Sequence, residues 1–571
     1  LRWGVYVVFK APNDYAAACF KQYGMTTDRT GRYAALYRPY HLIGLELGSD
    51  HRFTLTSMLL RQTEDEARSD TDITDSQLQQ GYRLRWTENS LRSSQLGGQH
   101  RFPLFEEMAD FDWQYTDATA RRFEPNLRQY EFDVTDDGSR TLSRINDGNR
   151  QQWSDLVDDS RSLDLGFKVP FALDEGAIYG TVDLNAGRTE RDRDSYIRRY
   201  RFGTPNPRPG FNAVRGLPTI GQMLVPGFIG PDGFVLQEFT TGTDNYFASQ
   251  RLDYVALGFD VAFDDRFRIN VGARSESNDQ RVTTFSVLQA GQEVESVIDQ
   301  RDLLPSFGAT WMIDESQQLR FGWSRTLSRP DFRELTPAPF LDPVLDFITF
   351  GDPDLVTAEI TNYDLRWEYY FSSDESLSVA LFRKEFDKPI EKQLLPGAGE
   401  ILLTLANAES ATNQGIEVDW FQRLGFAGDW FGGMELSNWF VAANYSWIDS
   451  EIRLDPSRSG INTNLSRPLE GQSPYVANLQ VGYSHPDGIH DLARKGRTRR
   501  RCRSTWPASA SCRWASTPSR TSTSSRPASS TSTGSGNSPA TGRAACACAT
   551  CWTRRSSSGR ATSTSASSTV A

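Results

Sequence analysis

The chain has 571 residues, of which 12% are aromatic, and a formal net charge of −11. Only 38% of the residues are hydrophobic, the mean hydropathy is −0.53 and no run of 18 apolar residues occurs, which excludes a membrane protein built of helices. The acidic surplus excludes nucleic acid as the main partner, because phosphate binding requires an excess of Lys and Arg.

Alternating apolar and polar side chains recur along the chain and predict β-strands. The clearest segments, in chain order, are residues 162–169, 254–263, 267–274, 364–371, 377–381, 416–420 and 479–484. Within residues 364–371, one face carries Leu365, Trp367, Tyr369 and Phe371, and the other carries Asp364, Arg366 and Glu368. A two-residue period places one type of side chain on each face of a sheet. An aromatic, apolar face suits a wall that meets lipid.

The connections between these segments alternate between short and long. Short links are expected at residues 48–51, 103–109, 173–176, 264–266, 314–317, 372–375 and 485–490, with a somewhat longer one at 423–431. Long polar loops are expected at residues 11–32, 66–77, 123–159, 191–245, 284–297, 329–357, 389–410 and 450–471. Outer-membrane barrels have short periplasmic turns and long extracellular loops, whereas a soluble sandwich or propeller has no reason to keep this order. The pattern predicts about 16 strands.

Two segments carry a more specific signal: Arg325–Leu335, with the sequence RTLSRPDFREL, and the strand pair within Asn362–Glu391. Together they resemble the C-terminal barrel of a TonB-dependent outer-membrane receptor. The resemblance covers most of residues 1–493 and is most specific between Arg301 and Tyr483. It implies an all-β fold, a transmembrane antiparallel up-and-down β-barrel that is an incomplete form of a receptor barrel of about 22 strands. The family's plug domain, with its TonB box, is expected to be missing from this chain.

Residues 494–571 differ sharply from the rest. They lack Phe, Tyr, Ile, Leu, Asp and Glu and contain 14 Lys or Arg, so residues 1–493 carry 48 basic against 73 acidic side chains. Such a segment cannot bury enough apolar area to offset its ordering entropy. The sequence therefore predicts a receptor-like β-barrel fragment at 1–493 and a disordered, low-complexity basic tail at 494–571. A translational frameshift near Ala493 is the simplest explanation, and a genuine basic tail is the alternative.

No catalytic or metal-binding motif is visible, and neither a cofactor nor an enzymatic activity is expected. The five His form no H-E-x-x-H motif, and there is no G-x-S-x-G or phosphate-binding loop. The spacing of His485 and His490 is explained by ordinary turn residues between them. Five of the six Cys lie in the tail, where the C-x-x-C of Cys548 and Cys551 lacks the surroundings of a redox or metal site.

Two loops supply candidate ligand contacts. The segment Arg188–Arg201 opens the longest loop, and its arginines and tyrosines could hold an anionic, aromatic ligand such as a ferric chelate. The favoured alternative is that this segment pairs its own charges in solvent or contacts lipopolysaccharide phosphates. Aromatic residues in Pro337–Asp354 could line a ligand vestibule or only pack that loop. The candidates are Tyr196, Arg198, Arg199, Tyr200, Arg201, Phe340, Phe347 and Phe350.

Charged side chains opposite the apolar strand faces are expected to line the lumen. These are Arg268, Arg274, Arg320, Arg366, Glu368, Glu417 and Asp419. In the receptor family this wall faces the plug, so the resemblance implies that the seven residues hold the plug through hydrogen bonds and ion pairs. In a plain porin the same residues would set ion selectivity.

The resemblance implies a TonB-dependent receptor and transporter in the Gram-negative outer membrane. Its function would be active uptake of a scarce ligand, most often a ferric siderophore. The implied partners are the TonB–ExbB–ExbD complex acting through the plug, lipopolysaccharide and outer-membrane lipid, and a ferric chelate or other small ligand. The alternative is a passive porin-like or structural barrel without energy coupling. A plug-coding segment upstream of Leu1 in the intact gene would separate these two hypotheses.

Overall fold

The structure is a computed structural model of the full chain, and its contacts divide the chain into two units, Leu1–Ser504 and Thr505–Ala571. The residues that it describes all lie in the first unit. They are residues 3–10, 29–74, 77–135, 137–143, 149–173, 177–285, 291–337, 340–341, 348–395, 402–457, 464–484 and 491–499. Most of the predicted tail therefore lies outside the described residues, and the boundary after residue 493 stays a prediction.

Strands make up most of the described chain. In its first part these are β1 (Trp3–Lys10), β2 (Arg29–Tyr37), β3 (Tyr40–Leu47), β4 (His51–Thr74), β5 (Gln77–Leu104), β6 (Glu107–Val134), β7 (Arg140–Leu142), β8 (Asn149–Leu173), β9 (Ile178–Gly203) and β10 (Val235–Glu238). They continue with β11 (Tyr246–Phe263), β12 (Phe267–Phe285), β13 (Glu293–Asp314), β14 (Gln317–Ser328), β15 (Phe340–Leu341), β16 (Ile348–Phe350), β17 (Ala358–Tyr370), β18 (Ser376–Asp387), β19 (Ile390–Leu395), β20 (Leu402–Asn407), β21 (Ser410–Arg423), β22 (Trp439–Arg453), β23 (Ser466–Arg467), β24 (Tyr475–Ser484) and β25 (Asp491–Arg499). Short helical segments are α1 (Asn212–Arg215), α2 (Ile220–Met223), η2 (Pro226–Phe228), η3 (Gly242–Asp244) and η4 (Leu424–Phe431).

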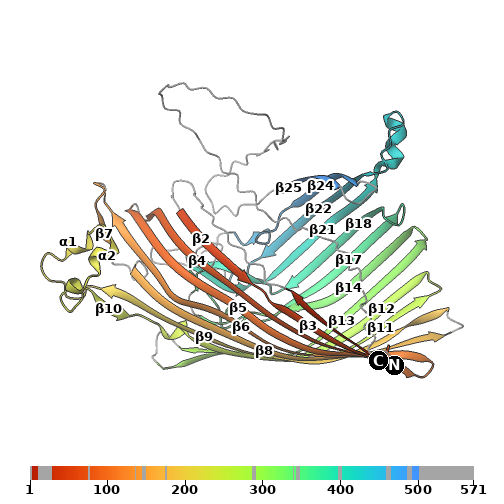
Figure 1. Cartoon of the computed structure of the whole chain (residues 1–571), viewed down its shortest axis with the longest axis horizontal. Coiled ribbons are helices and arrows are strands. Elements are labelled where there is room, and N and C mark those ends of the chain that lie inside the picture. Colours follow the sequence, from red (N-terminus) through yellow and green to blue (C-terminus); the bar gives the residue numbers. More distant parts are fainter. Residues whose placement is uncertain are drawn as a thin grey trace, which may run out of the picture. The chain divides into compact units, whose positions relative to one another are not determined.

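The main sheet has 21 strands, and each long strand pairs antiparallel with its neighbour along the chain. Figure 1 shows these strands side by side in one curved layer, from β2 to β25. The predicted all-β, antiparallel, up-and-down arrangement is confirmed. The strand count exceeds the predicted one because β7, β10 and β23 are short strands within loops, and because β2 and β3 pair with successive parts of β4. Within the described residues no ladder joins β25 to β1.

Several strands are much longer than a bilayer requires. β5 and β6 have 28 residues each, although a tilted strand crosses the hydrocarbon in about 10. The loops predicted at 66–77 and 123–159 are wrong, since β4, β5, β6 and β8 extend through most of both ranges. Beyond the bilayer both faces of a strand meet water. The apolar alternation that marks a membrane strand therefore stops, while the hydrogen-bonded ladder continues.

The short links behave as predicted wherever they are described. β11 and β12 are joined by a tight turn in which Asp264 and Asp265 have φ values of 45° and 52°. Asp tolerates this left-handed conformation better than most residues, because its short side chain can bond locally. Other short turns join β3 to β4, β13 to β14 and β17 to β18.

The apolar strand faces point outward. On β11, Val255, Leu257 and Phe259 are among the exposed large hydrophobic side chains, as are Phe267, Ile269 and Val271 on β12. Exposed apolar residues at every second position are what a lipid-facing wall requires. No helix among the described residues is long and apolar enough to cross a membrane.

Buried apolar clusters lie instead where loops fold against the strands. One cluster joins Tyr246, Ala248, Val282 and Ile298 of β11–β13 to Phe332, Leu335, Leu355 and Leu405. A second packs Phe211, Met223 and Phe234 of the long β9–β10 connection against Phe132 and Leu142.

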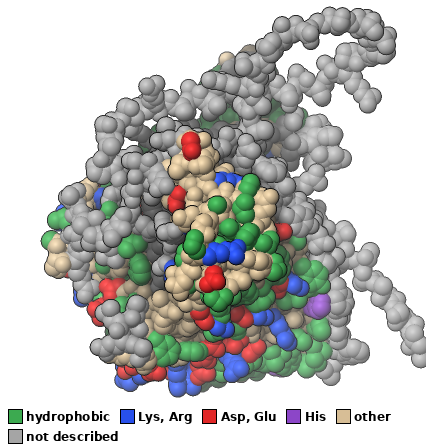
Figure 2. Space-filling model, turned by 90° about the vertical axis from the view of Figure 1, so that its left-hand side faces the viewer, with side chains coloured by type: hydrophobic (Ala, Val, Ile, Leu, Met, Phe, Trp, Pro, Cys, Tyr) green, Lys and Arg blue, Asp and Glu red, His purple; other side chains and the backbone are tan. Residues whose placement is uncertain are grey.

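A separate four-stranded sheet is formed by β15, β16, β20 and β19. Figure 1 shows α1, α2 and β10 together at the left-hand end of the long strands, and Figure 2 shows that this side carries basic and acidic side chains interspersed.

Candidate functional site

The strand register places all seven predicted lumen residues on one face of the sheet. Arg366 lies directly opposite Arg320, which shares a row through Thr310 with Arg268. On the other side of this row, Ala380 joins Arg366 to Glu417. This face is opposite to the exposed apolar residues, and we refer to it as the inner wall. Their role in holding a plug stays a prediction.

Two like charges lie side by side at the centre of this row and require a counter-charge. Glu368 supplies it, with 2.7 Å between its Oε1 and Arg366 Nε and 3.5 Å between its Oε2 and Arg320 Nη2. In addition to these two ion pairs, the Tyr370 hydroxyl donates a hydrogen bond to the carboxylate at 2.7 Å, and the Gln318 amide donates another. Glu368 is 7% exposed, so these donors replace the water that it loses. The carboxylate therefore orients both guanidinium groups along the inner wall.

A second network on the inner wall is centred on Arg329, the residue after β14. Its Nη2 lies 2.8 Å from Glu276 and 2.9 Å from Asp302, on β12 and β13. Arg274 reaches the same Glu276 at 2.6 Å and also lies 3.6 Å above the ring centroid of Tyr254. Charge-assisted bonds of this kind are among the stronger polar contacts in proteins. They fix the start of the loop that follows β14 against the neighbouring strands.

The loop itself contains most of the motif Arg325–Leu335, and its aromatic residue is clamped by two arginines of β9. Phe332 is 1% exposed, and the guanidinium groups of Arg191 and Arg193 each lie 5.0 Å from its ring centroid. Arg193 also bridges Asp158 of β8, at 2.5 Å, and Asp331, at 2.9 Å. We call Arg191, Arg193, Asp158, Asp331 and Phe332 the clasp. It holds a loop that follows β14 against strands that lie far earlier in the chain.

Local hydrogen bonds stabilise the turn that presents Phe332. The Asp331 amide donates to Glu334 at 2.9 Å, and the Arg333 amide donates to Asp331 Oδ1 at 3.1 Å. Burial of the loop raises the pKa of Glu334 and lowers the pKa of Arg333, because the charged form of each side chain loses hydration. These hydrogen bonds fix the turn, and water that entered the loop would favour the charged forms of Glu334 and Arg333.

The residues predicted in Arg188–Arg201 do not converge on one side of β9. Tyr196, Arg198 and Tyr200 share the outer face, whereas Arg199 and Arg201 share the inner face. Arg198 pairs with Glu238 at 2.8 Å and lies 5.2 Å above the Tyr200 ring, and Arg199 pairs with the buried Asp244. In the other predicted loop, Phe340 begins β15, Phe350 ends β16 and Phe347 lies outside the described residues. The binding roles of these side chains stay predictions.

The sequence did not predict that Arg191 and Arg193 contact Phe332 and Asp331. Arg191 and Arg193 stand two residues apart in the basic segment, a spacing that places both on one face of a strand. That spacing was the available signal, but it could not show that Phe332 would reach them. No cluster of His, Cys, Asp and Glu within the described part of the chain could hold a metal ion.

Comparison with known proteins identifies the family. A family model described as TonB dependent receptor-like, beta-barrel matches residues 23–542. The chain belongs to the TonB-dependent receptor β-barrel family. Members of this family are outer-membrane receptors, in agreement with the exposed apolar wall. Among curated proteins nothing matches the chain.

Solved structures of receptors from this family resemble the chain at low identity. The ferric citrate transporter FecA is 11% identical with a TM-score of 0.47, and the match covers 84% of this chain and 65% of FecA. The siderophore receptor PiuA from Acinetobacter baumannii is 10% identical with a TM-score of 0.46, over 84% of this chain and 70% of PiuA. The alcaligin receptor FauA from Bordetella pertussis is 14% identical with a TM-score of 0.42, over 86% and 68%. The chain thus spans just under two thirds of the length of FecA.

Proposed function

We propose that this chain is the barrel part of an energised outer-membrane importer for a scarce ligand, most plainly a ferric siderophore. The observation that carries the proposal is the family match over residues 23–542, on a sheet whose outer face is apolar and whose inner wall is charged. The ligand would bind at the extracellular loops and the apex of the plug. The TonB–ExbB–ExbD complex would then act on the plug and release the ligand through the lumen.

The inner wall supports this proposal through its chemistry. Its arginines are held in fixed orientations by Glu368 and Glu276, so it presents an ordered pattern of hydrogen-bond donors. Such a surface can bind a protein domain inside the lumen and exchange those bonds when the domain moves. The name of FecA contains an iron chelate, ferric citrate, and PiuA is named a siderophore receptor, so iron chelates are the substrate class that we propose.

Uptake measurements on a strain that carries the gene test the proposal. A deletion strain complemented with the gene is given individual radiolabelled ferric chelates, in the presence and absence of TonB. We expect uptake of one chelate class at nanomolar supply, and its loss when TonB is removed. Uptake that persists without TonB and does not saturate would instead establish the passive porin-like alternative. A strain that takes up no chelate but grows on a different scarce ligand in a TonB-dependent manner would correct the substrate while keeping the mechanism.

A further inference from the structure

The link between β21 and β22 differs from the other short links of the sheet. It covers residues 424–438 and contains the helical segment η4, whereas the other described links at this edge have two to five residues. Figure 1 shows this segment in cyan at the upper right, where it projects past the ends of the strands. Short links of an outer-membrane barrel lie on the periplasmic side, so we call residues 424–438 the periplasmic hairpin.

The periplasmic hairpin exposes three large apolar side chains. Trp430 is 75% exposed, Met434 is 60% exposed and Phe426 is 50% exposed. The rings of Phe426 and Trp430 meet edge to face, with 5.5 Å between their centroids. Single exposed apolar residues are common on protein surfaces, but three within one link form a patch. Aromatic residues and Met are enriched in protein–protein interfaces, so the patch has the composition of a docking surface.

Backbone contacts hold the periplasmic hairpin in one shape. The Gly433 amide donates a hydrogen bond to the Gly428 carbonyl at 3.0 Å. A Cβ atom at Gly428 would lie only 2.5 Å from the Met434 carbonyl oxygen, so the two halves of the hairpin approach closely there. Ala427 is 5% exposed, on the packed side, while Trp430 is left in solvent. A preformed patch of this kind loses little conformational entropy when a partner binds.

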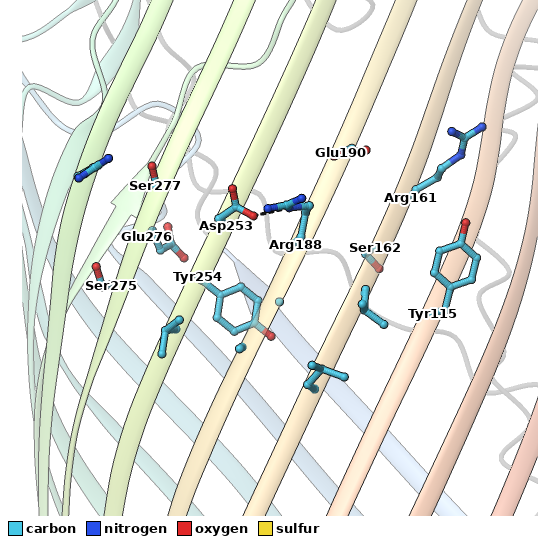
Figure 3. A pocket seen from close by; sticks show the side chains of 16 residues that line it. Tyr115, Arg161, Ser162, Arg188, Glu190, Asp253, Tyr254, Ser275, Glu276 and Ser277 are labelled. Atoms are coloured by element: carbon cyan, nitrogen blue, oxygen red, sulfur yellow. Dashed lines mark hydrogen bonds and ion pairs between the residues drawn. The ribbon is translucent and has the colours of Figure 1, made fainter.

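The short links on this edge of the sheet are acidic. Where the structure describes them, they carry nine carboxylates and one basic side chain, Arg266, and none of the nine forms an ion pair with a described residue. On the outer face of the strands, by contrast, Asp253 is paired with Arg188 (Figure 3). The nine, which we call the acidic rim, are Asp50, Glu106, Asp264, Asp265, Glu315, Asp374, Glu375, Asp429 and Glu435. Their unbalanced negative charge attracts a basic surface and repels an acidic one.

These charges decide between the possible occupants of the apolar patch. A second copy of the chain would bring a second acidic rim against the first. Anionic lipid headgroups are repelled in the same way, because residues 424–438 contain Asp429 and Glu435 but no Lys or Arg. Helices that lie on a membrane surface are instead rich in basic residues. A protein with an apolar cleft and a basic surface around it matches both the patch and the rim.

We infer that the periplasmic hairpin is the docking site of a soluble, basic periplasmic protein that has an apolar cleft. Trp430 and Phe426 enter the cleft, and the acidic rim steers the partner to this edge of the sheet. A protein held there stands at the end of the barrel where an imported ligand leaves the lumen. The inference rests on the outer-membrane location in the proposed function. It goes beyond that function, because this partner is separate from the complex that acts on the plug.

Photo-crosslinking in living cells tests the inference. The photo-reactive amino acid benzoylphenylalanine replaces Trp430 in the full chain. In the control it replaces Phe247, which is 54% exposed at the end of β11 that is remote from the short links. We expect one soluble, basic protein to be attached from position 430, in cells with and without TonB, and none from position 247. Import plays no part in this readout, so failure of the crosslink and failure of the uptake assay are distinguishable.

The attached protein is then purified, and its affinity for the full chain is measured in mild detergent. W430A should weaken binding about thirtyfold, the effect of a central aromatic anchor, and the high exposure of Trp430 means that the fold is not at risk. The double variant D429N and E435Q should weaken binding about threefold at low salt and reduce its salt dependence. F247A and D279N change an exposed ring and an exposed carboxylate outside the hairpin, and both should bind like the parent chain.

Four results would overturn the inference. The first is a crosslink from position 430 to phospholipid alone, or no crosslink at all, which shows that no protein docks there. The second is a crosslink between two copies of this chain. The third is loss of the adduct in cells without TonB, which assigns the hairpin to the energy-coupling complex. The fourth is parent-like affinity of W430A, which shows that the captured protein does not use the apolar patch.

Discussion

Replacing Phe332 by alanine is expected to release the loop that follows β14. The ring is 1% exposed and packs with Leu335, Leu355 and the inner face of β11–β13. Removing a buried Phe costs about 3–5 kcal/mol, and each guanidinium over its face contributes about 0.5–1 kcal/mol more. Part of this loss is recovered when water hydrates the two arginines, so we expect a net destabilisation of the docked loop of about 3 kcal/mol. That corresponds to roughly a hundredfold rise in local opening.

Amide hydrogen exchange of residues 329–336 measures this opening directly, because local opening sets the protection of loop amides. F332L keeps most of the apolar volume and loses the contact with the arginines, so it should raise exchange by about fivefold. F321A removes an outer-face ring that is 41% exposed, and it should leave the loop unchanged. Unchanged protection in F332A would show that the backbone hydrogen bonds hold the loop without the clasp.

Further expectations concern single carboxylates. E368Q should lower the free energy of unfolding by about 2 kcal/mol, since it leaves Arg320 and Arg366 side by side without a counter-charge. E385Q, which breaks the exposed Arg383–Glu385 pair, should lower it by well under about 1 kcal/mol. Denaturation midpoints of the two variants measure the difference. Hydrogen bonds from Thr135 and Ser139 lower the pKa of Asp137 to about 2. The stabilisation of its turn should therefore be complete above the ordinary Asp pKa and be lost as pH falls through the lowered pKa of about 2, which the Ser139 amide resonance can follow. Burial raises the pKa of Glu334, so the contribution of this side chain to loop docking should be complete below the ordinary Glu pKa and be lost as pH rises through the raised pKa. E334Q should remove this part of the pH dependence of amide protection while keeping the acceptor for the Asp331 amide.

The membrane part of the fold could be predicted from the sequence because lipid imposes a two-residue period. Phe267, Ile269 and Val271 show that period in the sequence and are exposed in the structure. The extension of β4 to Thr74 could not be predicted in this way. There the strand lies beyond the apolar band, and residues such as Glu66 are buried by ion pairs with Arg83 and Arg85 and not by apolar packing.

Of the candidate site, the inner wall could be predicted from the sequence and the clasp could not. Register follows from alternation, so the shared face of Arg320, Arg366 and Glu368 was accessible from sequence. The clasp was not, because it joins Phe332 to Arg193 across β11–β14 and depends on how a loop folds back. Likewise, the neighbouring Arg198 and Arg199 look like one basic cluster in the sequence, yet the strand sends them to opposite faces.

The exceptional length of β4, β5, β6, β8 and β9 has a mechanical consequence. These strands have 24 to 28 residues, so each stands well clear of the hydrocarbon. At a rise of about 3.3 Å per residue and a tilt of about 45°, the excess carries their far ends roughly 35 Å from the lipid surface. Continuous antiparallel ladders join these strands into one stiff sheet, so the far ends of the strands are held at a fixed distance from the lipid.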